Sequence, residues 1–321
     1  MQRGSTLETL PVSNEGLLGV IDQARDSLNS IILGKDKEIA LALACLLGRG
    51  HLLIEDLPGL GKTMLAQTLA KVLGLSYQRI QFTSDLLPAD IIGISIFQKH
   101  SGEFVFQPGP VFAQLVLADE VNRATPKAQS ALLEAMEEHQ VSADGRTHRL
   151  PEPYFVVATQ NPSDQIGTFP LPESQLDRFL MRIQLGYPDE ISERELITGE
   201  DRRLLLQNVE SVLAPELLLR LQGAASKVHL SSPLLDYIQA LVRFTRESPN
   251  IETGLSPRGS QALALAARAL AFIQHNAGVY PDDVQAVFAA VAGHRLKPSS
   301  NSSYQNCAEL CRHVLDNVAI S

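Results

Sequence analysis

Apolar residues follow two different periods along this chain. In residues 14–31 and 36–47 they recur at helical spacing, as at Leu17, Ile21 and Leu28. From residue 51 onward, short apolar runs of strand length alternate with longer helical runs. The strand-like runs lie at residues 51–54, 77–82, 114–118, 154–159 and 181–185. Strands that alternate with helices form a parallel sheet with helices on both faces, so the pattern predicts an α/β fold.

The chain beyond Pro188 shows only helical periods. We expect helices there at residues 190–208, 215–228, 233–246, 259–275 and 281–296. A chain of 321 residues is long enough for two domains, because single hydrophobic cores stop growing at about 250–300 residues. We therefore predict an α/β core over residues 1–188 and a smaller, all-helical domain over residues 189–321.

Two β-hairpins interrupt the alternation of strands and helices. Between about residues 84 and 111, the runs IIGISIF and EFVFQ flank a His-Ser-Gly turn, with prolines at both borders. Residues 140–150 contain Asp144–Gly145, a dipeptide typical of tight hairpin turns. Insertions of this kind lie on the surface of a domain.

The sequence DLPGLGKT, residues 56–63, joins the first strand to a helix and suits a triphosphate. Gly59 and Gly61 let the backbone approach phosphate oxygens, and the helix N-terminus supplies positive potential. Lys62 can reach the β- and γ-phosphates, and the Thr63 hydroxyl suits Mg²⁺. The usual spacing, GxxxxGK[ST], has glycine where this chain has Asp56. Because a carboxylate would repel the phosphates, we expect the Asp56 side chain to point away from them or to cap the turn.

Polar residues also end two further strands. Asp119 follows the buried run LVLA and can hold Mg²⁺, and Glu120 can take a proton from an attacking water. Asn161, at the end of VVATQ, can orient that water and contact the γ-phosphate. In most proteins, two acids at a strand end form a surface turn, and Asn-Pro is also a common turn. We interpret these residues as functional because the chain also contains the phosphate loop.

Two arginines are placed where a rigid element presents the guanidinium. Arg178 lies in LDRFL, and Arg258 lies in LSPRG at a predicted helix start. Such groups stabilise negative charge on a transferring phosphoryl group, either in the same chain or from a neighbouring one. A surface salt bridge is the alternative for each.

Composition narrows the classes of partner. The chain has 27 Lys and Arg against 36 Asp and Glu, a net charge of -9, which disfavours a broad phosphate-tracking surface for nucleic acid. Its three cysteines form no CxxC pair, and an odd number is a poor disulfide framework, so we expect a reducing cytoplasm. The apolar stretches are too short or too interrupted for insertion into a membrane.

These motifs resemble the AAA+ ATPases and, within them, the MoxR family. The most specific segment is ADEVNRATPKAQSALLEAMEE, residues 118–138, supported by ATQNP, LPESQLDRFLM and LSPRGSQALALAARALA. The resemblance implies an αβα core with a helical lid, ATP and Mg²⁺ as ligands, and ATP hydrolysis.

The resemblance also assigns roles to single residues. It implies that Lys62 and Thr63 are the Walker A pair and that Asp119 and Glu120 are the Walker B pair, with Thr63 and Asp119 at the metal. Asn161 is then sensor 1, Arg178 the arginine finger and Arg258 sensor 2. The ATP-binding residues that it implies are Ile32 and Gly34 around the adenine, and Pro58, Gly59, Leu60, Gly61, Lys62, Thr63 and Met64 around the phosphates.

The resemblance further implies an assembly and a biological role. It implies a ring, expected to be a hexamer, with Arg178 acting on the nucleotide of the adjoining copy. It also implies a chaperone-like remodeller of protein partners, in complex maturation or metal-cofactor insertion, together with a protein that carries a von Willebrand A (VWA) domain.

Two alternatives stay open from the residues alone. One is a motor stimulated by nucleic acid through Arg146, His148 and Arg149, and the other is a scaffold that binds nucleotide without hydrolysing it.

Overall fold

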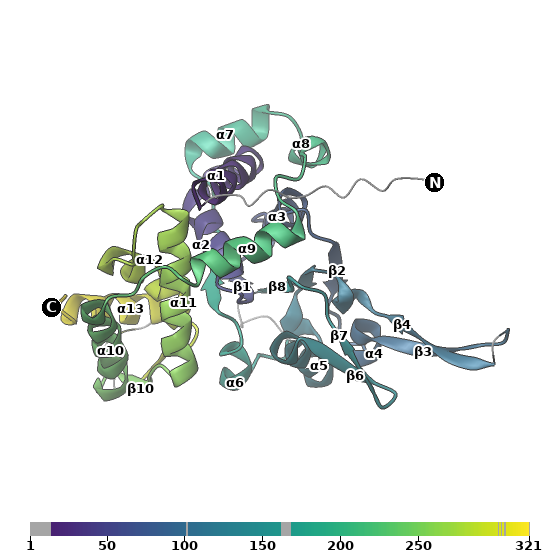
Figure 1. Ribbon diagram of the computed structural model, residues 1–321. Coiled ribbons are helices and arrows are strands. Elements are labelled where there is room, and N and C mark those ends of the chain that lie inside the picture. The colour runs from purple at the N-terminus through teal and green to yellow at the C-terminus, as the bar shows by residue number, and fades with distance from the viewer. Residues whose placement is uncertain are drawn as a thin grey trace.

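The computed structural model describes residues 14–100, 102–161, 168–300, 302, 304 and 306–320. Its centre is a five-stranded, fully parallel sheet with the strand order β2-β5-β8-β1-β9 (Figure 1). The strands are β1 (Leu52–Glu55), β2 (Tyr77–Gln81), β5 (Leu115–Asp119), β8 (Phe155–Gln160) and β9 (Met181–Ile183). All five lie at the predicted places, so the α/β core is confirmed. Because the strands are parallel, their carboxyl ends meet at one edge of the sheet.

Helices cover both faces of this sheet. On β5, the side chains of Leu115 and Leu117 join one hydrophobic cluster, whereas those of Val116 and Ala118 join the other. Because both faces are buried there, the central strands β1, β5 and β8 read as continuous apolar runs rather than alternating ones. The first face is covered by α1 (Asn14–Ile31), α2 (Asp36–Leu47) and α3 (Lys62–Val72), and the second by α4 (Pro88–Ile92) and α5 (Pro126–Glu138). Shorter connecting helices are η1 (Pro110–Phe112), η2 (Val121–Arg123) and α6 (Glu173–Leu176).

Both predicted hairpins are confirmed. β3 (Gly93–Gln98) pairs antiparallel with β4 (Glu103–Pro108), and β6 (Gln140–Ala143) pairs antiparallel with β7 (Arg146–Arg149). Ser101, in the turn predicted for the first hairpin, lies outside the described residues. The β3–β4 hairpin extends far from the sheet (Figure 1). The ring of Phe106 stacks on that of His148 with centroids 4.0 Å apart, so the two hairpins contact each other.

The chain beyond Pro188 is mainly helical, as predicted, with two corrections. Gly199 separates two helices where one was predicted over residues 190–208. A short antiparallel pair, β10 (Ile251–Thr253) with β11 (Lys297–Pro298), lies where no strand was predicted. These strands have only three and two residues, too few for a strand period. The helices are α7 (Glu190–Thr198), α8 (Arg202–Asn208), α9 (Pro215–Ala225), α10 (Ser232–Glu247), α11 (Pro257–Ile273), α12 (Pro281–Ala292) and α13 (Cys307–Asn317). Within the described residues, no helix has the length and apolar character needed to cross a bilayer.

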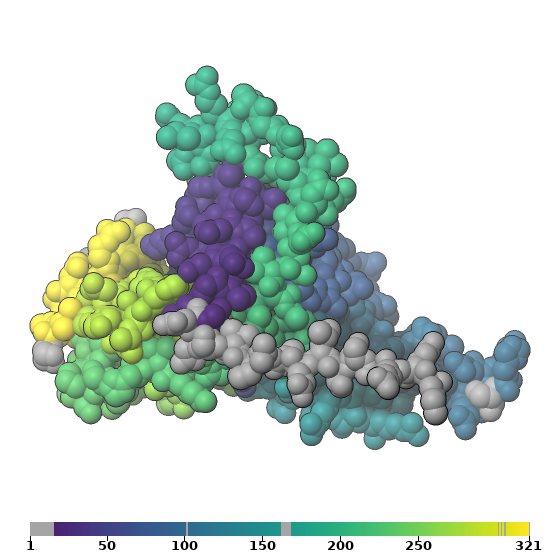
Figure 2. Space-filling view, turned by 45° about the horizontal axis from the view of Figure 1, so that its top comes forward, coloured from purple at the N-terminus to yellow at the C-terminus, as the bar shows by residue number. Residues whose placement is uncertain are grey.

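The C-terminal helices pack directly on the α/β core. Figure 2 shows α1 at the surface beside the α7–α8 segment and the C-terminal helices. Gln222 of α9 donates its amide to the carbonyl of Leu46 at 2.8 Å, and the N–H of Val212 donates to the carbonyl of Val72 at 2.8 Å. One hydrophobic cluster runs from the sheet through α2 into α11 and α12. The division at residue 188 therefore stays a prediction about chain organisation.

His51, just before β1, is a buried histidine with a fixed tautomer. Its Nδ1 accepts a hydrogen bond from the N–H of Val156 at 3.0 Å, so its Nε2 carries the proton and donates to the carbonyl of Met136 at 3.1 Å. Only 5% of His51 is exposed. Burial lowers the pKa of His51 to about 4, because the charged imidazolium loses its hydration.

The free energy of unfolding is expected to fall as pH decreases from about 6.5 to about 4. In this window the unfolded chain protonates His51 and the folded protein does not, so protons favour unfolding. The loss from His51 approaches roughly 3 kcal/mol at the acid end. Urea titrations of the wild type and His51→Gln across this range provide the measurement. The stability of the variant should depend less on pH, by up to about 1.4 kcal/mol per pH unit, and parallel pH curves would contradict the prediction.

Candidate active site

The segment between β1 and α3 forms the predicted phosphate loop. Gly59 and Gly61 have φ angles of +87° and +88°, in the left-handed region that glycine adopts without strain. A Cβ atom at either position would meet nothing within 4 Å, so backbone conformation rather than crowding requires glycine here. Gly61 caps α3 without a side-chain hydrogen bond. The first N–H groups of α3 are therefore available to an anion.

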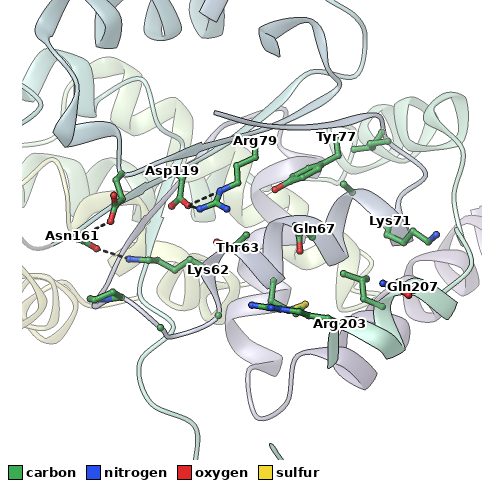
Figure 3. Close-up of a pocket in the computed structure, with 18 residues that line it drawn as sticks. Lys62, Thr63, Gln67, Lys71, Tyr77, Arg79, Asp119, Asn161, Arg203 and Gln207 are labelled. Carbon is green, nitrogen blue, oxygen red and sulfur yellow. Dashed lines mark hydrogen bonds and ion pairs between the residues drawn. The ribbon is translucent and has the colours of Figure 1, made fainter. Parts of the chain in front are cut away.

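A cavity of about 910 Å³ opens beside this loop. Lys62 and Thr63 from α3, Asp119 and Glu120 from the end of β5, and Asn161 from the end of β8 all line it (Figure 3). The predicted loop residues Pro58, Gly59, Gly61 and Met64 line it too. The volume lies within the range of about 300–1,000 Å³ typical of cofactor and ligand pockets. The structure thus brings together residues that are up to about a hundred positions apart in sequence.

Asp119 is held in one orientation by two partners. Its Oδ1 accepts from the Thr159 hydroxyl at 2.6 Å. Its Oδ2 accepts from the Arg79 guanidinium at 2.6 Å (Figure 3). Only 10% of the Asp119 side chain is exposed. A buried carboxylate with fixed oxygens is a rigid ligand for a cation.

Glu120 follows Asp119 in the sequence, but its side chain has different partners. Its backbone has a φ angle of +57°, an uncommon value for a residue other than glycine. One carboxylate oxygen accepts from the Asn161 amide at 3.2 Å, and the other accepts from the Gln81 amide at 2.9 Å. Arg123 lies 3.2 Å from that second oxygen. The predicted base and the predicted sensor are thus in direct contact.

Lys62 connects the loop to the end of β8. Its ammonium donates to the amide oxygen of Asn161 at 3.2 Å and to the main-chain carbonyl of Asp56 at 2.5 Å. Burial lowers the pKa of Lys62, and the carboxylates of Asp56, Asp119 and Glu120 oppose that shift. Asn161 therefore joins the Lys62 ammonium to the Glu120 carboxylate through two hydrogen bonds.

Arg178 and Arg258 lie elsewhere. Neither lines the cavity beside the loop. Both pair with the carboxylate of Glu137 on α5, Arg178 at 2.9 Å and Arg258 through its Nη2. They line a second cavity of about 230 Å³ together with Arg49 and Arg295. The predicted site residues therefore form two separate groups within one chain.

Three predicted nucleotide-binding residues also lie outside the lining of the large cavity: Ile32, Gly34 and Leu60. Gly34 has a φ angle of +64°, and a Cβ atom there would lie 2.4 Å from the Ser192 hydroxyl oxygen and 2.8 Å from Asp189 Oδ2. The segment around Gly34 thus packs against the start of α7. Contact of Ile32 and Gly34 with adenine stays a prediction.

Several lining residues have no counterpart in the predicted site. Arg79 and Tyr77 of β2 line the cavity, as do three residues of α8: Arg203, Leu206 and Gln207. Period-2 spacing on β2 could have indicated Arg79, because it places Arg79 and Gln81 on one face of the strand. No local signal indicates α8, since its position depends on long-range packing.

Comparisons with known proteins agree with this geometry. Residues 51–181 match the ATPase family associated with various cellular activities (AAA), and residues 243–309 match the AAA lid domain. The chain is 42% identical over 308 residues to the uncharacterised protein YeaC of Bacillus subtilis, covering 95% of this chain and 96% of YeaC. It is 41% identical over 301 residues to the chaperone MoxR1 of Mycobacterium tuberculosis, covering 90% of this chain and 79% of MoxR1.

A solved structure extends the likeness to three dimensions. The crystal structure of an inferred ATPase from Cytophaga hutchinsonii matches with a TM-score of 0.87 and 36% sequence identity, covering 96% of this chain and 97% of that one. The likeness thus extends over nearly the whole of both chains. With these matches and the phosphate loop in place, the chain belongs to the MoxR family of AAA+ ATPases.

Proposed function

We propose that this chain binds ATP with Mg²⁺ in the cavity beside the phosphate loop and hydrolyses it. The observation that carries the proposal is the convergence of Lys62, Asp119, Glu120 and Asn161 on that cavity. A second carboxylate beside the metal-binding one favours transfer of the phosphoryl group to water rather than to a small acceptor. Membership of the AAA+ family supports ATP hydrolysis in general terms.

The side chains fit a magnesium ion. Thr63 supplies a hydroxyl and Asp119 a carboxylate on the same cavity, and oxygen ligands of this kind suit Mg²⁺. Asp119 already pairs with a cationic group, Arg79, so a positive charge is favourable at its Oδ2. Thr63 and Asp119 would hold Mg²⁺, and the bound ion would supply positive charge that offsets the charge of the phosphates.

The remaining residues account for the chemistry at the γ-phosphate. Lys62 neutralises charge on the β- and γ-phosphates, and the Asn161 amide orients the attacking water. Glu120 takes the proton from that water as it attacks in line with the leaving oxygen. The hydrogen bonds from Gln81 and Asn161 to Glu120 hold this base within the cavity.

We further propose that the site is completed by a second copy of the chain in a ring, a hexamer by analogy with the family. Arg178 and Arg258 do not line the large cavity of their own chain, yet both form ion pairs with Glu137. Because both guanidinium groups contact the same carboxylate, both could reach the nucleotide of the adjoining subunit from one position. We therefore propose that Arg258 acts at the same neighbouring site as Arg178.

The purpose of turnover is proposed from the family. The relative MoxR1 is described as a chaperone, so we propose that this chain remodels protein partners in the cytoplasm. In this role it would act with a VWA-domain protein, either in the maturation of a complex or in the insertion of a metal cofactor. We do not favour a nucleic-acid motor, because the net charge is -9 and His148 of the basic hairpin is engaged in stacking on Phe106.

Steady-state phosphate release tests the proposed activity. The purified chain should hydrolyse ATP with Mg²⁺ present, and chelation of divalent ions with EDTA should reduce the rate by about 100-fold or more. Returning Mg²⁺ in excess should restore it. A rate that stays at the buffer background at every ATP and protein concentration would contradict hydrolysis and leave a nucleotide-binding scaffold.

A further inference from the structure

Asp56, the residue that departs from the usual phosphate-loop spacing, connects the loop to the start of the lid. One carboxylate oxygen, Oδ1, accepts from the N–H of Leu57 at 2.9 Å and so caps the turn. The other, Oδ2, accepts from the N–H groups of Leu185 and Gly186, each at 2.7 Å. Glycine at this position could make none of these contacts.

The carboxylate points away from the phosphate-binding surface. Asp56 is not among the residues that line the large cavity, although Pro58 and Gly59 are. Three main-chain N–H groups offset its negative charge. Hydrogen bonds to an ionised group are roughly twice as strong as neutral ones. Asp56 is therefore a structural connection rather than a ligand of phosphate or metal.

The main chain of Asp56 is tied to the site itself. Its carbonyl accepts from the Lys62 ammonium at 2.5 Å, and its N–H donates to the carbonyl of Gln160 at 3.2 Å. Gln160 immediately precedes Asn161, the second partner of Lys62. One residue thus joins the phosphate-binding lysine on one side to residues 185 and 186 on the other.

Residues 185 and 186 lead directly into the helical region. Gly186 has a φ angle of +63°, and Tyr187 accepts a hydrogen bond at its carbonyl from Lys35 at 2.8 Å. Asp189 then caps α7 by accepting from the N–H of Ser192 at 2.8 Å. The next helix, α8, returns to the large cavity through Arg203, Leu206 and Gln207. A shift of residues 185 and 186 therefore changes where the chain enters the α7–α8 segment, part of which lines the cavity.

We propose that Asp56 is a positioning residue that couples phosphate binding at Lys62 to the orientation of the α7–α8 segment. The inference rests on the proposed function, because ATP is the ligand that draws the Lys62 ammonium toward its phosphates and away from the Asp56 carbonyl. The loop moves with Lys62, and the carboxylate carries that movement to residues 185 and 186. Closure of α8 over the nucleotide then follows phosphate binding.

Two substitutions at Asp56 separate this role from simple stability. Asp56→Gly restores the usual loop residue and removes the connection, and Asp56→Asn keeps the size but loses the charge and one acceptor. Both should bind ATP within about threefold of the wild type, whereas kcat should fall about tenfold or more, with the glycine variant more affected. Asp236→Asn, at an exposed position of α10, is the matched control.

A distance measurement reports the coupling directly. In a Glu120→Gln background, fluorophores on cysteines introduced at Lys127 of α5 and at the exposed Leu204 of α8 should approach on addition of ATP, with Cys307→Ser to prevent stray labelling. Thermal unfolding of each protein measures folding separately. The ATP-dependent change should be lost in Asp56→Gly and retained with Asp236→Asn.

The outcomes distinguish the two levels of the proposal. If Asp56→Gly turns over ATP and changes the distance as the wild type does, the coupling is wrong even though hydrolysis stands. If Asp56→Gly loses ATP binding and thermal stability together, Asp56 serves only to hold the fold, and the coupling is again wrong. Absence of ATP hydrolysis by the wild type with Mg²⁺ present would instead overturn the proposed function itself.

Discussion

Glu120→Gln is expected to bind ATP as tightly as the wild type and to reduce its hydrolysis by about 100-fold or more. Glutamine keeps the size of the side chain and can keep the hydrogen bond from Asn161, but it cannot accept the proton of the attacking water. The backbone at Glu120, with its φ angle of +57°, is unaffected by the change. Fluorescent-nucleotide binding and phosphate release measure the two quantities separately.

The same experiment needs a control and offers a second use. Glu216→Gln, at an exposed position of α9, should leave both binding and hydrolysis unchanged. Hydrolysis by Glu120→Gln at the wild-type rate would remove Glu120 from the mechanism. Because the variant holds ATP without turnover, it should also retain protein partners in a pull-down, and partners recovered equally well without ATP would contradict nucleotide-controlled remodelling.

Arg178→Ala is expected to reduce ATP hydrolysis by about 1,000-fold with little change in ATP binding. The reason is that Arg178 does not line the large cavity of its own chain and, in the proposed shared site, would act on the transition state of the adjoining one. Arg258→Ala should share this pattern, because both guanidinium groups contact Glu137. Nucleotide titration and phosphate release on each variant provide the measurement.

The control for these arginines is Arg243→Ala, an exposed arginine of the lid helix α10. It should preserve hydrolysis. If Arg178→Ala instead weakens ATP binding by the same factor as it slows turnover, the residue contributes to ground-state binding and not to the transition state alone. Such a result would contradict an arginine finger.

The sheet and the phosphate loop could be predicted because their signals are local. Each strand is a short apolar run with turn residues at its ends, and Gly59 and Gly61 are needed at positive φ angles that few other residues adopt. The polar strand ends, Asp119 and Asn161, also follow from local pattern. Parallel pairing then brings these ends together without further information.

The rest could not be predicted because it depends on contacts between distant segments. The role of Arg79 on Asp119 follows from the pairing of β2 with β5, and the place of α8 follows from packing after the sheet is complete. Asp56 is the clearest example. The sequence shows a carboxylate where glycine is usual, but only the fold shows that Leu185 and Gly186 are its partners.

A mixing experiment tests the central claim, which is that each ATP site is shared by two copies of the chain. Lys62→Ala and Arg178→Ala should each be inactive alone, since one cannot hold the triphosphate and the other cannot complete the neighbouring site. Mixed in equal amounts and allowed to exchange subunits, they should recover about one quarter of wild-type hydrolysis, because random assembly pairs an intact Lys62 with an intact Arg178 at that fraction of interfaces. No recovery in rings shown to contain both variants would contradict a shared site.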